Sequence, residues 1–173
     1  MHITSTRDAL LGAIAPTAAA AARQDILGHL LFTARGSTVT VTGSDGPMRL
    51  TLPVDAQVAT EGAVLLDAAT LLATVRSLPA GAITVREDNS RVVVEGGGAR
   101  FRLAAASVED YPPESTKNTT WSEAGSVDGG ELARVLSETM YAASADENRY
   151  GLNGLHVEVN DGTLRAVATD GSR

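Results

Sequence analysis

The chain is predicted to be an α+β protein, in which helices cover one face of antiparallel strands. Two observations lead to this class. Short segments with an apolar residue at every second position recur along most of the chain and are separated by Gly- and Asp-rich turns. Longer segments instead carry apolar residues three and four positions apart, which is typical of helices packed on a sheet.

The first helix is expected directly after a short strand at residues 2–5. Residues 5–8 (STRD) resemble a capping box, and apolar residues recur at helical spacing from Leu10 to Ile14. We expect Pro16 to close this helix, because proline lacks the N–H that the next turn requires. The alanine-rich residues 17–23 then either prolong the helix after a kink or loop out.

Strands are expected to follow in pairs joined by turns. The first hairpin comprises residues 26–34 and 38–42, turned at Arg35-Gly36-Ser37. Further strands are expected at residues 48–52, 58–66, 83–86, 92–95 and 100–103. Gly96-Gly97-Gly98 lies between two strands and opens no helix, which indicates a hairpin turn and not a phosphate-binding loop.

A second helix is expected between the strands at 58–66 and 83–86. Asp67 is suited to cap it, and the helix runs through Ser77 until Pro79 ends it. The apolar side of this helix consists of Leu71, Leu72, Val75 and Leu78.

The chain is expected to hold one complete domain and the beginning of another. Residues 104–126 include Pro112-Pro113 and show no apolar period, as a linker should. Residues 128–131 (DGGE) form a second capping box, and the helix after it is amphipathic. We place the first domain at residues 1–118, the linker at 119–127, and the first helix and hairpin of a second domain at 128–173.

The two parts share a repeated pattern. Residues 151–171 align without a gap on residues 26–46, and each segment contains a strand, a turn, a strand and an Asp-Gly pair. The identities are Leu27/Leu152, Leu30/Leu155, Thr38/Thr163, Asp45/Asp170 and Gly46/Gly171. The equivalent positions of Asp45 and Asp170 favour turn-forming or capping roles over an acid/base pair.

Composition excludes several classes of protein. The net charge of −7 disfavours a repressor or nuclease that holds DNA by neutralising phosphates. The absence of Cys excludes disulfides and thiolate metal sites, and it fits a reducing cytoplasm. Neither a signal peptide nor a membrane-spanning run is evident, so we expect a cytoplasmic protein. His2, His29 and His156 lack metal-ligand spacing, and no Ser lies in a nucleophile elbow. We therefore expect no enzyme, no metal and no cofactor.

The order of motifs resembles the bacterial DNA polymerase III β subunit family, the β sliding clamps. The motifs of the first part are ILGHLLF (26–32), TVTVTGSD (38–45), TVRSLP (74–79), SRVVVEGGGARFRL (90–103) and EDYPP (109–113). In the second part, LNG (152–154), a hairpin and ATDG (168–171) followed by an Arg resemble the opening of the second clamp domain. The resemblance covers essentially the whole chain and implies a DNA-clamp fold and the N-terminal portion of a clamp.

The resemblance also implies three binding surfaces. A partner-peptide groove would have one wall made of Leu152, Thr169, Gly171, Ser172 and Arg173, although Ser172 stands where the family more often has His or an aromatic residue. A head-to-tail protomer interface would use Phe101 and Leu103 as apolar contacts, flanked by Arg76 and Arg100. The DNA-facing residues would be Arg23, Arg149 and Tyr150. The alternative structural roles are core positions for Leu152 and Phe101 and solvated surface for the loop residues.

The function implied is processivity: a homodimeric ring surrounds duplex DNA and tethers the replicative polymerase, the clamp loader and other clamp-motif proteins to it. Two alternatives stay open. One is a truncated clamp relative that forms no ring and acts as an interaction module or is a non-functional fragment. The other is an unrelated hydrolase or transferase with a coincidental repeat, which would require a nucleophile or acid/base site.

Overall fold

The computed structural model describes residues 1–23, 25–113, 125–146 and 148–173. The chain divides into two compact units, Met1–Ser115 and Thr116–Arg173, and each is described by itself. The strands of the first unit are β1 (His2–Thr6), β2 (His29–Arg35), β3 (Thr38–Ser44), β4 (Arg49–Val54), β5 (Ala56–Thr60), β6 (Gly62–Asp67), β7 (Ala82–Asp88), β8 (Arg91–Gly96) and β9 (Ala99–Ala106). Its helices are α1 (Arg7–Ala20) and α2 (Ala68–Ser77), with short 3-10 turns at Ile26–Gly28 and Val108–Asp110.

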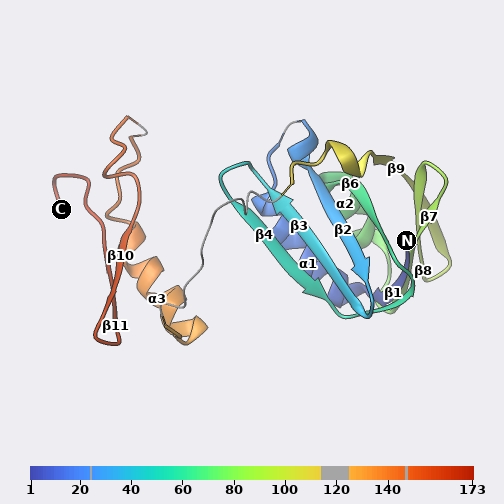
Figure 1. Ribbon diagram of the computed structural model, residues 1–173, viewed down its shortest axis with the longest axis horizontal. Helices are drawn as coiled ribbons and strands as arrows, with labels where there is room; N and C mark the ends of the chain where they lie inside the picture. The colour runs from blue at the N-terminus through green and yellow to red at the C-terminus, as the bar shows by residue number, and fades with distance from the viewer. Residues whose placement is uncertain (24, 114–124, 147) are drawn as a thin grey trace. The chain divides into compact units, whose positions relative to one another are not determined.

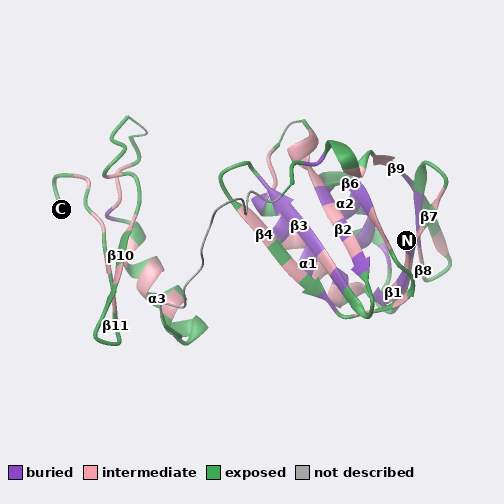
Figure 2. Cartoon of the chain, in the orientation of Figure 1, coloured by how far each residue is buried: buried purple, intermediate pink, exposed green. Residues whose placement is uncertain are grey.

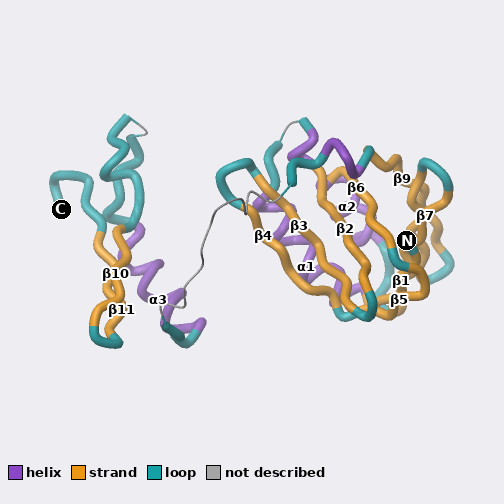
Figure 3. Tube along the Cα trace, viewed as in Figure 1, coloured by secondary structure: helices purple, strands orange, loops and turns teal. Residues whose placement is uncertain are grey.

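The nine strands form one antiparallel sheet in the order β4-β3-β2-β6-β9-β8-β7-β1-β5. Helices α1 and α2 pack against each other and against the face formed by β3, β4 and β6 (Figures 1 and 3). This arrangement confirms the predicted α+β class. The sheet is continuous across β6 and β9 through only two residue pairs, Leu65–Ala106 and Leu66–Ala105.

The apolar core lies between the sheet and the two helices, and it draws on both halves of the sheet (Figure 2). Alternate residues of β1, β2 and β7 are buried, as the period of two predicts, whereas β6 and β8 each have three consecutive buried residues. The fully buried side chains include Phe32, Leu30, Leu66, Ile3, Ile83 and Leu10. Phe32 is the largest of them and is 1% exposed, so one aromatic ring anchors a core that otherwise consists mostly of aliphatic residues.

The predicted end of helix α1 at Pro16 was wrong, and of the two alternatives for the alanine-rich residues after it, prolongation of the helix is the one observed. The helix continues to Ala20, with Pro16 inside it. Proline leaves the carbonyl of residue i−4 without a helical hydrogen bond, and that residue is Gly12. Both Pro16 and Gly12 are exposed, so water can satisfy this carbonyl. On the opposite side, the Thr17 hydroxyl donates to Ala13 O at 2.7 Å and is fully buried.

Two predicted strands differ from the observed ones. The single strand expected at residues 58–66 is two strands, β5 and β6, separated at Glu61-Gly62. Gly62 has φ +148°, a conformation that favours glycine, and the Glu61 carboxylate turns back to accept from the backbone N–H of Gly36 at 2.8 Å. In the first hairpin, residues 26–28 form a 3-10 turn and β2 begins at His29.

Helix α2 has the predicted bounds. Its N-cap is Asp67, whose Oδ1 accepts from the backbone N–H of Thr70 at 2.8 Å. Hydrogen bonding by Thr70, chiefly through its side chain and also through its backbone N–H, lowers the pKa of Asp67, and the charge of nearby His29 lowers it further. The ionised cap therefore stabilises the folded state.

We expect Asp67→Ala to lower the free energy of unfolding by about 1 kcal/mol, because it removes the N-cap. The folded pKa of Asp67 lies below its unfolded value, so the contribution of the charge is complete above about pH 4 and is lost as the pH falls through the folded pKa. Asp67→Asn keeps a capping oxygen but does not titrate. Urea unfolding from neutral to acidic pH should therefore show a smaller loss of stability in Asp67→Asn than in the wild type. Equal losses would contradict this role.

The boundary region expected at residues 104–126 begins within a strand. Residues 104–106 belong to β9, and the segment after it ends in Tyr111, which is 5% exposed. The Arg49 guanidinium lies 5.5 Å from the centre of the Tyr111 ring and donates to Pro112 O at 2.6 Å. Burial raises the pKa of the Tyr111 hydroxyl. The first unit thus includes the EDYP sequence, whereas the predicted boundary at residue 118 and most of the predicted linker lie outside the described residues.

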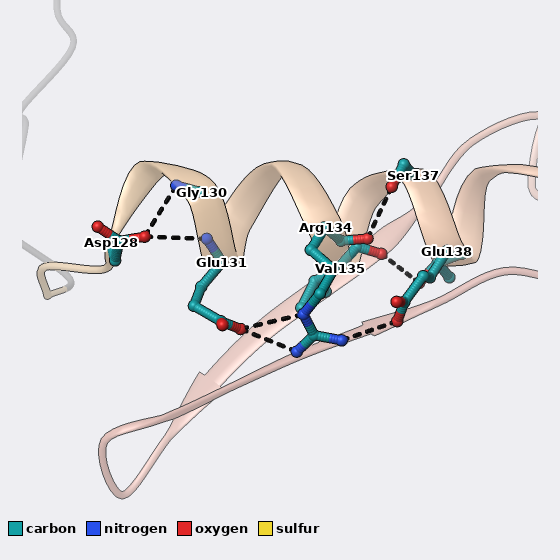
Figure 4. Close-up of polar contacts among 8 residues, drawn as sticks. Asp128, Gly130, Glu131, Arg134, Val135, Ser137 and Glu138 are labelled. Carbon is teal, nitrogen blue, oxygen red and sulfur yellow. Dashed lines mark hydrogen bonds and ion pairs between the residues drawn. The ribbon is translucent and has the colours of Figure 1, made fainter.

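The second unit contains α3 (Gly129–Met140) and the hairpin of β10 (His156–Asn160) and β11 (Thr163–Val167). Asp128 caps α3 by accepting from the N–H groups of Gly130 and Glu131 (Figure 4). The Glu131 carboxylate pairs with Arg134 at 2.8 Å, so only the Asp128 half of the predicted capping box forms. The hairpin turns at Asp161-Gly162, where both residues have positive φ as predicted for an Asp-Gly turn.

Candidate functional site

Strand β9 presents an open edge. Residues 99–104 of this strand pair with β8, from Gly96–Ala99 to Arg91–Ala104. On its other side, only Ala105 and Ala106 pair with β6, so within the described residues the backbone of 99–104 has no strand beside it. Such an edge offers backbone donors and acceptors to a strand of another chain.

The predicted interface residues lie on or near this edge with unequal exposure. Phe101 is 36% exposed, whereas Leu103, two residues along the same face, is 9% exposed and belongs to the core. Arg100 points to the opposite face and forms an ion pair with Glu95 at 2.9 Å. Arg76 lies at the end of α2, where its carbonyl accepts from Arg7 at 3.1 Å. Phe101 is therefore the apolar side chain that this edge presents.

A shallow concavity between α1 and α2 brings together two arginines that the sequence analysis assigned to different surfaces. Arg23, just beyond the end of α1, and Arg76 both line it, and both are exposed. Most of the other lining residues are alanines, together with Asp67 and Leu72. Short side chains between two cations leave room for a bulky anionic surface to approach the helices.

The predicted groove wall in the second unit is a tight turn organised by Asp170. Asp170 Oδ1 accepts from the backbone N–H groups of Ser172 at 2.8 Å and Arg173 at 3.2 Å, and its Oδ2 pairs with Arg173 Nε at 2.9 Å. Thr169 adds a hydroxyl that accepts from Gly171 N at 3.0 Å. These hydrogen bonds and Arg173 lower the pKa of Asp170, the bond from Ser172 contributing most. The equivalent Asp45 accepts from Met48 N at 2.8 Å, which confirms the predicted turn-forming role of both aspartates.

Arg149 joins this turn to the loop before the hairpin. Its guanidinium donates to Asp170 O at 2.9 Å and pairs with Asp146 at 3.5 Å. Leu152, on the same loop, is half-buried, and its carbonyl accepts from Ser144 N at 2.7 Å. Tyr150 is 86% exposed. The structure thus bonds Arg149, which was expected to face DNA, to Asp170, the residue between Thr169 and Gly171 of the predicted groove wall. No sequence pattern indicated this contact.

The described residues contain no arrangement typical of catalysis. No group of three or more His, Asp or Glu side chains in the described ranges is placed to hold a metal ion. Across the same ranges, no helix is both long and apolar enough to cross a membrane. The described residues instead offer three candidate surfaces: the open edge of β9, the concavity between α1 and α2, and the turn at Thr169–Arg173.

The first unit is an antiparallel sheet backed by two helices, and the second unit begins with a helix and a hairpin. This arrangement defines a protein of the DNA-clamp class. Residues 1–115 match the family model of the DNA polymerase III beta subunit N-terminal domain, and residues 126–173 match that of its central domain. The chain belongs to the DNA polymerase III beta subunit family.

Individual relatives agree with this assignment. The chain is 36% identical to the beta sliding clamp of Caulobacter vibrioides over 183 residues, which cover 100% of this chain and 49% of that protein. It is 33% identical to the Pseudomonas aeruginosa beta sliding clamp, covering 100% of this chain and 48% of the relative. The chain thus spans about half the length of the curated relatives it matches.

Solved structures give the same result. The Caulobacter crescentus polymerase III beta structure superimposes with a TM-score of 0.84 at 35% identity. The superposition covers 99% of this chain and 48% of the Caulobacter chain. A Pseudomonas aeruginosa sliding clamp bound to griselimycin gives a TM-score of 0.86 at 32% identity, covering 99% of this chain and 47% of that one. The predicted DNA-clamp fold, as the N-terminal portion of a clamp, is confirmed.

Proposed function

We propose that this chain supplies the first domain and the beginning of the second domain of a sliding clamp, a ring that surrounds duplex DNA and tethers DNA polymerase III to it. The proposal rests on the match of both domain models in order and on the relatives named beta sliding clamp. The family acts as a processivity factor and not as an enzyme. A ring retains DNA by encircling it and needs no tight contacts to phosphates. A net charge of −7 is therefore compatible with this function.

The observation that carries ring formation is the open edge of β9. A ring requires each protomer to offer an edge that accepts a strand from the next protomer. The unpaired backbone at residues 99–104 offers such an edge, and Phe101 supplies an exposed apolar anchor beside it. Arg76 and Arg100 would flank the contact.

The other two surfaces complete the proposal. Arg23, at the concavity between α1 and α2, would face the phosphates, as would Arg149 and Tyr150 of the second unit. The turn at Thr169–Arg173, with Leu152, would form one wall of the groove for partner peptides. Replication partners, including a clamp loader and other clamp-motif proteins, and a cytoplasmic location follow from this role.

The proposal is tested by retention on DNA. The protein is loaded onto nicked circular plasmid with a clamp loader and polymerase III, and the complex is separated by gel filtration before and after the plasmid is linearised. A ring should stay on the circle and leave the linear form, because only a topological link distinguishes the two. Phe101→Asp should abolish retention, whereas Met48→Asp, a matched change at an apolar residue that is 50% exposed, should not.

Absence of retention on circular DNA would contradict the clamp function. Co-elution of the same protein with a full-length clamp would then favour the alternative, an interaction module that docks through Phe101 without forming its own ring. Light scattering on the purified protein gives the molar mass that separates the two cases.

A further inference from the structure

An arginine row crosses the sheet face that points away from the core. Strand registers place His2 opposite Arg86 and, next along, Arg86 opposite Val93 and Val93 opposite Arg102. Directly paired residues share a face, and neighbouring strands are about 4.8 Å apart. The row therefore spans β1, β7, β8 and β9, with Arg86 and Arg102 about 10 Å apart across β8.

The middle of this row is shielded from solvent. Val93 lies on the outward face of β8, yet it is 0% exposed. Its cross-strand partners Arg86 and Arg102 are the long side chains available to cover it with their aliphatic stems. A stem that packs on Val93 would lose less conformational entropy when its guanidinium binds an anion.

A depression at the end of the row gathers more positive charge. It is lined by Arg91 and Arg102, with Asp88, Asn89 and Ser90 from the β7–β8 turn. Arg91 is two positions from Val93 on the same face, so it lies diagonally across from Arg102. Among the described residues, neither Arg91 nor Arg102 is in an ion pair, and Arg86 has only a 3.7 Å contact with Asp88.

The charged groups that face this surface have a positive balance in an acidic chain. Four arginines at 86, 91, 100 and 102 stand against Asp88 and Glu95, and Glu95 is already paired with Arg100. The whole chain has a net charge of −7. Arg86 and Arg102 lie on different strands and are brought together only by the register of β7 and β9 on β8, so their spacing in the sequence does not indicate the cluster.

We propose that this arginine face, defined as Arg86, Arg91 and Arg102, is a docking surface for an acidic peptide segment of a partner protein. Guanidinium forks bind carboxylates with two parallel hydrogen bonds, and the face offers three of them within about two strand spacings. Duplex DNA fits the surface less well, since the net negative charge of the chain repels it. The surface lies on side chains of the sheet face, so it is separate from the backbone edge of β9 and does not depend on ring formation.

The test measures fluorescence anisotropy of a labelled peptide of alternating glutamate and serine, with the glutamine version of the peptide as its neutral control. The purified protein should bind the glutamate peptide at low ionic strength and bind the glutamine peptide at least about tenfold more weakly. Arg91→Glu with Arg102→Glu should weaken glutamate binding by at least about tenfold. Arg35→Glu, an exposed arginine at the β2–β3 turn, should leave it within about twofold.

Circular dichroism of the double variant must match the wild type, and Arg91→Gln with Arg102→Gln serves in its place if the charge reversal unfolds the protein. Equal affinity for the two peptides, or undiminished binding by a folded double variant, would overturn the proposal. So would a short DNA duplex that binds this face, requires the same two arginines and excludes the peptide. Retention on circular DNA is unaffected by these outcomes, so the two proposals fail independently.

Discussion

Replacing Gly43 with alanine should destabilise the first unit by about 3 kcal/mol or more, because it forces a helix away from the sheet. Gly43 lies in β3 beneath α1, where an added Cβ would overlap the carbonyl oxygen of Thr17 and lie 2.9 Å from its carbonyl carbon. Both atoms belong to the helix backbone, which a rotamer change does not move. The end of α1 is also held to β3 by the hydrogen bond from Ala22 N to Ser44 O at 3.0 Å.

Urea unfolding followed by circular dichroism measures this effect. The matched control is Gly12→Ala, in which the new methyl group meets nothing within 4 Å and lies on the exposed side of α1. This control should raise the free energy of unfolding by about 0.5–1 kcal/mol, as alanine favours the helix over glycine. A loss below about 1 kcal/mol in Gly43→Ala would mean that α1 can shift without cost.

Phe32→Ala should cost about 3–5 kcal/mol, because it empties the centre of a core that has few aromatic residues. Phe32 is 1% exposed and pairs with Val41 on one side and Val64 on the other. Only two Phe occur in the chain, and the other, Phe101, is 36% exposed. Phe32 is also the one aromatic member of the buried core cluster among the described residues.

The same unfolding experiment compares Phe32→Leu, which should cost about 1 kcal/mol since most of the volume is retained. Phe101→Ala is a second control and should change stability by less than Phe32→Ala, because part of its ring already contacts water. If Phe32→Ala and Phe101→Ala had the same effect, the core would not centre on Phe32.

Local sequence patterns were sufficient for most of the fold. The capping aspartates 67 and 128, the Asp-Gly hairpin turn and the strand alternation depend on residues close in sequence, and each was predicted correctly. The helix end at Pro16 and the single strand at residues 58–66 were predicted wrongly, because both depend on residues distant in the sequence or on solvent exposure. Proline is tolerated in α1 only because its side of the helix meets water, and the break at Gly62 depends on Glu61 reaching the distant Gly36.

The candidate site was predictable to a smaller extent. The alternation of β9 placed Phe101 and Leu103 on one face, but their different burial depends on how far the core extends along the strand. The bond from Arg149 to Asp170 joins residues 21 apart, and it forms only after the hairpin has brought the loop and the turn together. The burial of Tyr111 beneath Arg49 likewise needs a contact between β4 and a segment expected to be a linker.

The sheet of the first unit is weakly joined between β6 and β9, where only two residue pairs connect the strands. Backbone hydrogen bonds across this junction are few, so forces that bend one half of the sheet reach the other half mainly through side chains and helices. Helix α1 contacts β1 as well as β2, β3 and β4, and α2 contacts both β6 and β9. Each helix therefore packs on strands from both halves of the sheet. The two halves of the sheet are therefore joined more by helix packing than by backbone pairing.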